Sequence, residues 1–207
     1  MTKNEIYQII ENEANAIKNL PITDNFEKAI ELIYEQIHLK GGKLVVCGMG
    51  KAGQIAENIA ATFSSTGTPA VFLNPSEAQH GDLGILQKND LLLLISNSGK
   101  TPEVLRFIKL AQKLFLYKSF PQIKSIAITS NENPLTEKSD ICLSTGNPTE
   151  VCSLGLAPTT STTAMNVIGD ILVVGLMQKI NFSLPEYHIL HNGGEVGKKI
   201  KKKIIES

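Results

Sequence analysis

The sequence predicts a doubly wound α/β fold, in which helices flank both faces of a five-stranded parallel sheet in a three-layer sandwich. Three observations support this prediction. The strand-like runs are apolar almost without interruption, which is typical of strands buried on both faces. Helical stretches alternate with these runs along the chain. The chain has 207 residues, 42% of them hydrophobic, which is enough for one sizeable core.

Two amphipathic helices are predicted ahead of the sheet. Asn4 to Ile17 has apolar residues at helical spacing, and Asn25 to His38 repeats this pattern. Gly41 and Gly42 then end the helical pair.

Four strands and a weaker fifth follow this pair. The strands are expected at Lys43–Cys47, Ala70–Leu73, Leu91–Ile95, Ser125–Thr129 and, more weakly, Ile141–Leu143. The connecting helices are expected at Gln54–Ser64 and Pro102–Tyr117, with a short turn at Leu135–Lys138.

The most apolar stretch, Ala164 to Ile180, is interpreted as a core or interface helix. It contains Asn166 and Asp170 and is too short to span a bilayer. We therefore predict a single domain. Its parts are a helical pair (1–40), an α/β core (43–180) and a C-terminal helical segment (185–207).

The charge balance makes nucleic-acid and membrane partners unexpected. Lys+Arg and Asp+Glu both number 20, and the lysine-rich tail from Lys198 is best explained as a solvated helix face. The N-terminus has no apolar core of signal-peptide length. Cys47, Cys142 and Cys152 form no CxxC pair. A reducing cytoplasm is therefore the expected location.

A glycine-rich loop follows the first strand. LVVCGMGKAGQIA places Gly48, Gly50 and Gly53 in a G-x-G-x-x-G pattern between a strand and a helix. A dinucleotide site would need an acid at the end of the second strand, but the first acid there is Glu77, beyond a proline. Gly50 and Lys51 are followed by Ala52 rather than by serine or threonine, so the loop is not a P-loop either. Ligand binding and simple close packing of strand and helix both remain open.

A second loop, SNSGKTPEV, has the composition of an anion-binding site. Ser96, Ser98 and Thr101 surround the permissive Gly99, and Pro102 suits the first turn of a helix. Free backbone N–H groups at a helix start bind phosphate well. The alternative is that Thr101 merely caps the helix, but a cap needs only one hydroxyl. We favour a phosphate at this loop.

Two further features say less by themselves. Glu150 stands alone before a long loop and a Thr/Ser-rich helix start, a position in which a carboxylate is usually solvated. His188 and His191 are three residues apart but lack an obvious third metal ligand, although His80 beside Asp82 is conceivable. No metal is therefore expected.

Together these segments resemble the sugar isomerase (SIS) domain family, and within it the arabinose-5-phosphate isomerases. The resemblance runs from about Lys43 to Ile200, through GMGKAGQIA, STGTPA, EAQHGDLG, SNSGKTPEV, GLAPTTSTTA and HNGGEVGKKI. It implies a flavodoxin- or Rossmann-like sandwich. Many members continue into a pair of cystathionine-β-synthase-type domains, whereas this chain stops at Ser207 and so resembles the single-domain form.

The resemblance also implies roles for individual residues. The family's catalytic lysine matches Lys51, its two glutamates match Glu103 and Glu150, and its histidine matches His191. Phosphate contacts match Ser96, Ser98 and Thr101. We expect Asn97, Gly99, Gly48, Gly50 and His80 to border the same substrate. Ala52, Lys100 and Asn192 stand where serine, glutamate and proline are expected, which leaves the exact sugar open.

The implied activity is interconversion of D-ribulose 5-phosphate and D-arabinose 5-phosphate through an enediol(ate). This reaction moves a proton and needs no redox cofactor, so the glycine loop need not bind a dinucleotide. Two alternatives remain: a hexulose-phosphate isomerase, and a non-catalytic sugar-phosphate-binding module. Apolar helix surface in excess of what one sheet can cover predicts a homo-oligomer, and related domains imply a tetramer built from two dimers.

Overall fold

The computed structural model describes residues 1–193 and confirms the predicted α/β class. These residues form a five-stranded sheet with strand order β2-β1-β3-β4-β5, and every neighbouring pair is parallel. The strands are β1 (Leu44–Gly48), β2 (Ala70–Phe72), β3 (Leu91–Ile95), β4 (Lys124–Thr129) and β5 (Ile141–Ser144). All five predicted strands are present, and β3 has the predicted bounds.

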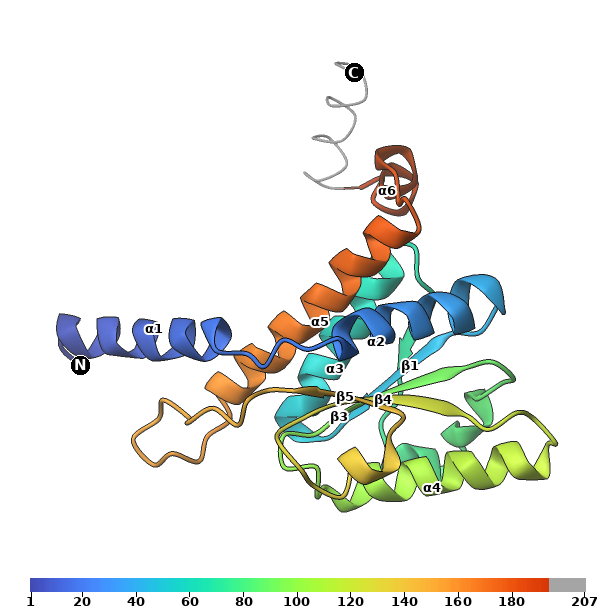
Figure 1. Cartoon of the computed structure of the whole chain (residues 1–207), viewed down its shortest axis with the longest axis horizontal. Coiled ribbons are helices and arrows are strands. Elements are labelled where there is room, and N and C mark those ends of the chain that lie inside the picture. Colours follow the sequence, from blue (N-terminus) through green and yellow to red (C-terminus); the bar gives the residue numbers. More distant parts are fainter. Residues whose placement is uncertain (194–207) are drawn as a thin grey trace.

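Helices cover both faces of this sheet (Figure 1). The long helices are α1 (Lys3–Lys18), α2 (Asn25–Ile33), α3 (Gly50–Ser65), α4 (Pro102–Tyr117), α5 (Thr160–Lys179) and α6 (Leu184–Leu190). A π-helical turn continues α2 over Tyr34–Leu39, and 3₁₀ turns lie at Glu77–His80, Asp82–Ile85 and Thr136–Lys138.

The two faces of the sheet bury two separate sets of side chains, because successive residues of a strand point to opposite faces. Val46 and Leu93 pack with residues of α2, α3 and α5. Val45 and Leu92 pack with residues of α4 and of the segment after β2. All five residues of β1 and of β3 are buried, which explains their continuous apolar sequences.

Two helices begin earlier than the sequence predicts. α3 starts at Gly50 rather than Gln54, so the glycine loop forms the first turn of the helix. α5 starts at Thr160 rather than Ala164, and its hydroxyl-rich residues are therefore helical. By length and composition α5 could cross a membrane, but half of its most apolar window is buried inside the protein.

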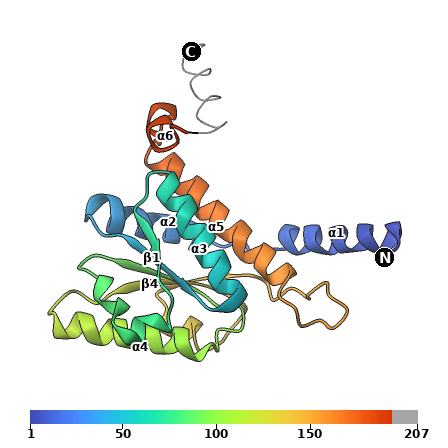
Figure 2. The same cartoon turned by 180° about the vertical axis from the view of Figure 1, so that it is seen from behind.

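Helix α1 lies apart from the three layers. Figures 1 and 2, which view the molecule from opposite sides, both show it extending away from the sheet beside the start of α5. Within residues 1–193, no α1 side chain is fully buried, and Ile6, Tyr7 and Ile10 are exposed. At the opposite end of α5, α6 comes just before the last described residues, 191–193 (Figure 1). The lysine-rich tail predicted from Lys198 lies outside the described residues.

Candidate active site at the carboxyl end of the sheet

A cleft of ≈ 290 Å³ lies where β1 and β3 end. These neighbouring strands lead into helices on opposite faces of the sheet, the position at which open parallel sheets commonly bind ligands. The lining residues come from the start of α3, the loop before α4, Glu150 and the start of α5: Met49, Lys51, Ala52, Ser96, Asn97, Ser98, Thr101, Glu150, Leu156, Pro158, Ser161, Thr162 and Met165. Six residues predicted from the sequence are among them, namely Lys51, Ser96, Asn97, Ser98, Thr101 and Glu150.

The loop from Ser96 to Thr101 forms one wall of the cleft. The hydroxyls of Ser96 and Thr101 lie 2.8 Å apart, and Ser98 Oγ accepts a hydrogen bond from the backbone N–H of Lys100 at 3.2 Å. Gly99 has a φ of +60°, and a β-carbon there would overlap the side chain of Asn133. The close turn of this loop therefore requires glycine.

The start of α4 distinguishes the two explanations for the hydroxyls. Thr101 is the N-cap residue, but among the described residues its side chain makes no capping hydrogen bond. Its hydroxyl instead faces that of Ser96. Simple capping therefore does not explain Thr101, and the first N–H groups of α4 remain available to an anion at the helix start.

Glu150 lies beside the start of α5 and is held there by three hydrogen bonds from Thr159 and Ser161. Its Oε2 accepts hydrogen bonds from the backbone N–H of Thr159 at 2.7 Å, the Thr159 hydroxyl at 3.0 Å and the backbone N–H of Ser161 at 3.3 Å. Burial by itself raises the pKa of Glu150, but hydrogen bonds from the Ser161 and Thr159 side chains and backbones outweigh it. The pKa is lowered from its ordinary value. Glu150 is therefore ionised near neutral pH, as a general base must be.

The glycine loop packs strand against helix and carries Lys51 into the cleft. A β-carbon on Gly48 would lie 2.8 Å from the carbonyl oxygen of Ala52, and one on Gly53 would lie 2.8 Å from that of Gly48. These contacts account for Gly48 and Gly53 without a ligand, and neither Gly48 nor Gly50 lines the cleft. Lys51 is exposed, and its Nζ donates to Gln54 Oε1 at 3.2 Å.

Besides Gly48, Gly50 and Gly99, three further predicted residues lie outside the lining. Glu103 is in the first turn of α4, two positions after Thr101. His80 is exposed at the end of a 3₁₀ turn, whose preceding residue Ser76 contacts Met49 of the cleft. His191 follows α6, beyond the far end of α5 from Glu150, and stacks on Tyr187 with ring centroids 4.0 Å apart. Because the 20-residue α5 is about 30 Å long, His191 and Glu150 of one chain do not meet.

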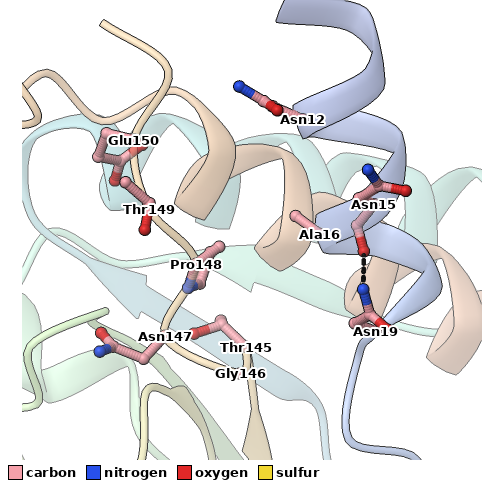
Figure 3. A pocket seen from close by; sticks show the side chains of 10 residues that line it. All are labelled: Asn12, Asn15, Ala16, Asn19, Thr145, Gly146, Asn147, Pro148, Thr149 and Glu150. Atoms are coloured by element: carbon pink, nitrogen blue, oxygen red, sulfur yellow. Dashed lines mark hydrogen bonds between the residues drawn. The ribbon is translucent and has the colours of Figure 1, made fainter. Parts of the chain in front are cut away.

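A second cavity of ≈ 430 Å³ lies on the other side of Glu150. Figure 3 shows Asn12 and Asn15 of α1 and Asn19, which follows that helix, on one side and residues 145–150 on the other. Glu150 lines both cavities. Within residues 1–193, no group of three His, Cys, Asp or Glu side chains is placed to hold a metal ion.

Residues 37–175 match the family described as the SIS domain. The chain belongs to this family. Besides Met49 and Ala52 of the glycine-loop motif, the cleft-lining residues that sequence reasoning did not assign to the site are Leu156, Pro158, Ser161, Thr162 and Met165. They lie within or beside GLAPTTSTTA, so that motif already pointed to the region.

Curated relatives of this SIS chain carry one name. The arabinose 5-phosphate isomerase KdsD of Yersinia pestis is 43% identical over 198 residues, which are 95% of this chain and 57% of the relative. The protein of the same name from Francisella tularensis is 43% identical over 88% of this chain and 54% of the relative. The chain thus spans little more than half the length of these relatives.

Solved structures support the same fold. A Bacteroides fragilis phosphosugar isomerase candidate involved in capsule formation is 61% identical, with a TM-score of 0.88 over 92% of this chain and 97% of that one. An Escherichia coli protein in complex with arabinose 5-phosphate is 33% identical, with a TM-score of 0.78 over 92% of this chain and 100% of that one.

Proposed function

We propose that this SIS domain is an aldose–ketose isomerase that interconverts D-ribulose 5-phosphate and D-arabinose 5-phosphate. The observation that carries the proposal is the placement of Glu150. It is held at the start of α5 and lines the same cleft as Lys51 and the hydroxyl-rich loop from Ser96 to Thr101. The name of the curated relatives and the arabinose 5-phosphate complex of the E. coli protein support this substrate.

In the proposed mechanism, one wall of the cleft binds the phosphate of the substrate and the other wall acts on its reacting carbons. The phosphate binds at the loop of Ser96, Ser98 and Thr101, next to the start of α4. This anchor fixes the reacting carbons near Glu150, which removes a proton from the carbon beside the carbonyl. The proton returns to the former carbonyl carbon, and the hydroxyl proton of the other carbon passes to the former carbonyl oxygen. The C=C bond of the enediol is thereby replaced by the isomeric C=O bond.

Lys51 and Glu103 complete the proposed proton and charge transfers. The Lys51 ammonium stabilises the oxygen on which negative charge develops in the enediolate, an effect worth about 2–4 kcal/mol in comparable sites. Glu103, in the first turn of α4, orients hydroxyls or relays protons. The reaction consumes no electrons, and we propose no redox cofactor and no metal.

We further propose that His191 acts on a neighbouring copy. An imidazole can both donate and accept a proton, which suits it to opening the furanose ring of an aldopentose phosphate. His191 lies beyond the far end of α5 from its own chain's cleft, which supports a role in another subunit. The exposed apolar residues of α1 and the apolar surface of α5 support a homo-oligomer, which we propose is a tetramer of two dimers. A cytoplasmic location is part of this proposal.

A coupled assay tests the proposed reaction. The purified chain is offered D-ribulose 5-phosphate and a set of hexulose phosphates, and the aldose products are measured. Turnover of the pentulose phosphate above all others is the expected result. Preference for a hexulose phosphate would show that the enzyme is a hexulose-phosphate isomerase instead. Binding of sugar phosphates without turnover of any would establish the non-catalytic binding module instead.

A further inference from the structure

Asn97 accepts hydrogen bonds from residues at the ends of β4 and β5. Its backbone carbonyl accepts hydrogen bonds from the Ser130 N–H at 2.9 Å and from the Thr129 hydroxyl at 3.3 Å. Its side-chain Oδ1 accepts a hydrogen bond from the Thr145 hydroxyl at 2.9 Å. Both acceptors of Asn97 are therefore engaged on the protein side, while the residue itself lines the substrate cleft.

Thr145 makes this contact from a rigid position. It directly follows β5, it is 1% exposed, and its backbone N–H donates to the carbonyl of Thr129 at 2.8 Å. Thr145 does not line the substrate cleft; it lines the neighbouring cavity beyond Glu150 (Figure 3). A buried hydroxyl must find a partner, and the Asn97 amide is the partner that this one has within residues 1–193.

The hydrogen bond pairs one end of the Asn97 amide with Thr145 and leaves the other end for the substrate. When the Thr145 hydroxyl donates to Oδ1, the two N–H donors of Nδ2 are directed away from Thr145. With the amide reversed, Oδ1 would face the cleft. That cleft already contains the Glu150 carboxylate, and it would bind an anionic substrate. A donor suits a cleft that contains the Glu150 carboxylate better than a further acceptor does, so the observed orientation is the favourable one.

We propose that Thr145 is a positioning residue for substrate specificity: it orients Asn97 so that Nδ2 donates to a hydroxyl of the sugar chain. This inference rests on the proposed isomerase function. Asn97 belongs to the phosphate loop, whereas Thr145 begins the segment that leads to Glu150. The amide between them thus lies between the phosphate and the reacting carbons. The bound group is a sugar hydroxyl rather than the phosphate.

Thr145→Val tests the proposal, because it keeps the shape of the side chain and removes the hydroxyl. We expect KM for D-ribulose 5-phosphate to rise about three- to tenfold, as for a lost hydrogen bond, with a smaller change in kcat. The dissociation constant of inorganic phosphate, measured by calorimetry, should change less than twofold. Thr145→Ser retains the hydroxyl and should restore the parent KM.

A double-mutant cycle separates positioning from a general loss of structure. In the Asn97→Ala background, Thr145→Val should have little further effect on KM, since the donor that it orients is already absent. Thermal unfolding of each variant verifies that it is folded, and the Asn97→Ala and Thr145→Ser variants carry the test if Thr145→Val does not fold. An unchanged KM in Thr145→Val, a full additional loss in the Asn97→Ala background, or equal weakening of inorganic phosphate would overturn the proposal. A parent chain that turns over no sugar phosphate would instead refute the proposed function on which it rests.

Discussion

The hydroxyl of Thr160, the first residue of α5, donates a hydrogen bond of 2.9 Å to Oε1 of Glu13 in α1. The other oxygen of Glu13 is buried and has no hydrogen-bond partner within the described part of the chain. The same helix start holds Glu150 through Thr159 and Ser161. Helix α1 and Glu150 are thus both hydrogen-bonded to the start of α5, at residues 159–161.

Thr160→Val should lower the free energy of unfolding by about 1–3 kcal/mol, because it leaves a partly buried carboxylate with neither oxygen hydrogen-bonded. Urea denaturation measures this change. Thr163→Val is the matched control, since the Thr163 hydroxyl bonds only the carbonyl of Thr159 in its own helix, at 3.2 Å. Equal effects of the two substitutions would show that the contact between the helices adds no stability.

Glu150→Gln should reduce kcat by orders of magnitude while inorganic phosphate still binds. Glutamine is close to glutamate in size but cannot accept the proton, and the phosphate loop belongs to a different segment. Exchange of solvent deuterium into the carbon-bound position of the substrate should stop as well. If exchange continues at the parent rate in this variant, Glu103 becomes the candidate base.

Thr159→Val should shift the acid limb of the pH profile of kcat/KM to higher pH. The Thr159 hydroxyl donates to Glu150 at 3.0 Å and helps to lower the pKa of that carboxyl. Without this bond the pKa rises, so the active ionised form is lost at a higher pH as the solution is acidified. Thr159→Ser keeps the hydroxyl and should leave the limb in place. A limb that moves to lower pH, or does not move, would exclude this hydrogen bond as a cause.

The same lowered pKa has a defined effect on stability. A carboxyl whose pKa is lower in the folded state stabilises the protein above the pKa that it has when unfolded. This contribution is lost as the pH falls through the folded-state pKa. The parent should therefore lose stability relative to Glu150→Gln on acidification, as measured by denaturation midpoints across pH.

Ser98→Ala should weaken sugar-phosphate binding by about 1–3 kcal/mol, the usual cost of losing a hydrogen bond to a charged group. Ser98 is an exposed residue that lines the cleft. Ser153→Ala is a suitable control, because Ser153 is exposed in the loop before α5 and does not line the cleft. Calorimetry with D-arabinose 5-phosphate and with unphosphorylated arabinose gives the result. Equal affinity for the two sugars would contradict a phosphate site.

Mixtures of inactive Lys51→Ala and inactive His191→Ala subunits should regain part of the activity after dissociation and reassembly. If His191 serves a neighbouring cleft, some mixed assemblies contain an intact Lys51 and an intact His191 in one site. The activity of the mixture, compared with either variant reassembled alone, is the measurement. Mixtures that stay inactive despite demonstrated exchange, or a parent that is active as a monomer, would refute the shared site.

The central strands β1, β3 and β4 were predictable because burial on both faces gives them nearly continuous apolar sequences. Leu91–Ile95 contains only leucine and isoleucine and forms β3 without deviation. Pro102–Tyr117 is equally clear, since proline marks the first turn of α4 and apolar residues follow at helical spacing. These features are local and depend on neighbouring residues alone.

The starts of α3 and α5 were not predictable from local propensity. Gly50 disfavours helix, but the close packing of Gly48 and Gly53 between β1 and α3 starts the helix there. The first N–H groups of α5 are satisfied by Glu150, which lies nine and eleven positions before Thr159 and Ser161. A lone loop glutamate gives no sign that it caps a helix after so long a loop. The hydrogen bond from Thr145 to Asn97 spans 48 positions and is equally invisible in the sequence.

The exposed position of α1 has a consequence for the order of folding. The sheet and its covering helices have a complete core of their own, whereas α1 contributes no fully buried side chain within residues 1–193. An isolated helix of 16 residues is only marginally stable in water, even with a capping box such as that formed by Thr2 and Glu5. The α/β core should therefore refold in a step whose rate is independent of protein concentration. In the proposed oligomer, helix α1 is covered only when copies of the chain associate. It should therefore become fully protected from hydrogen exchange in a later step, whose rate increases with protein concentration.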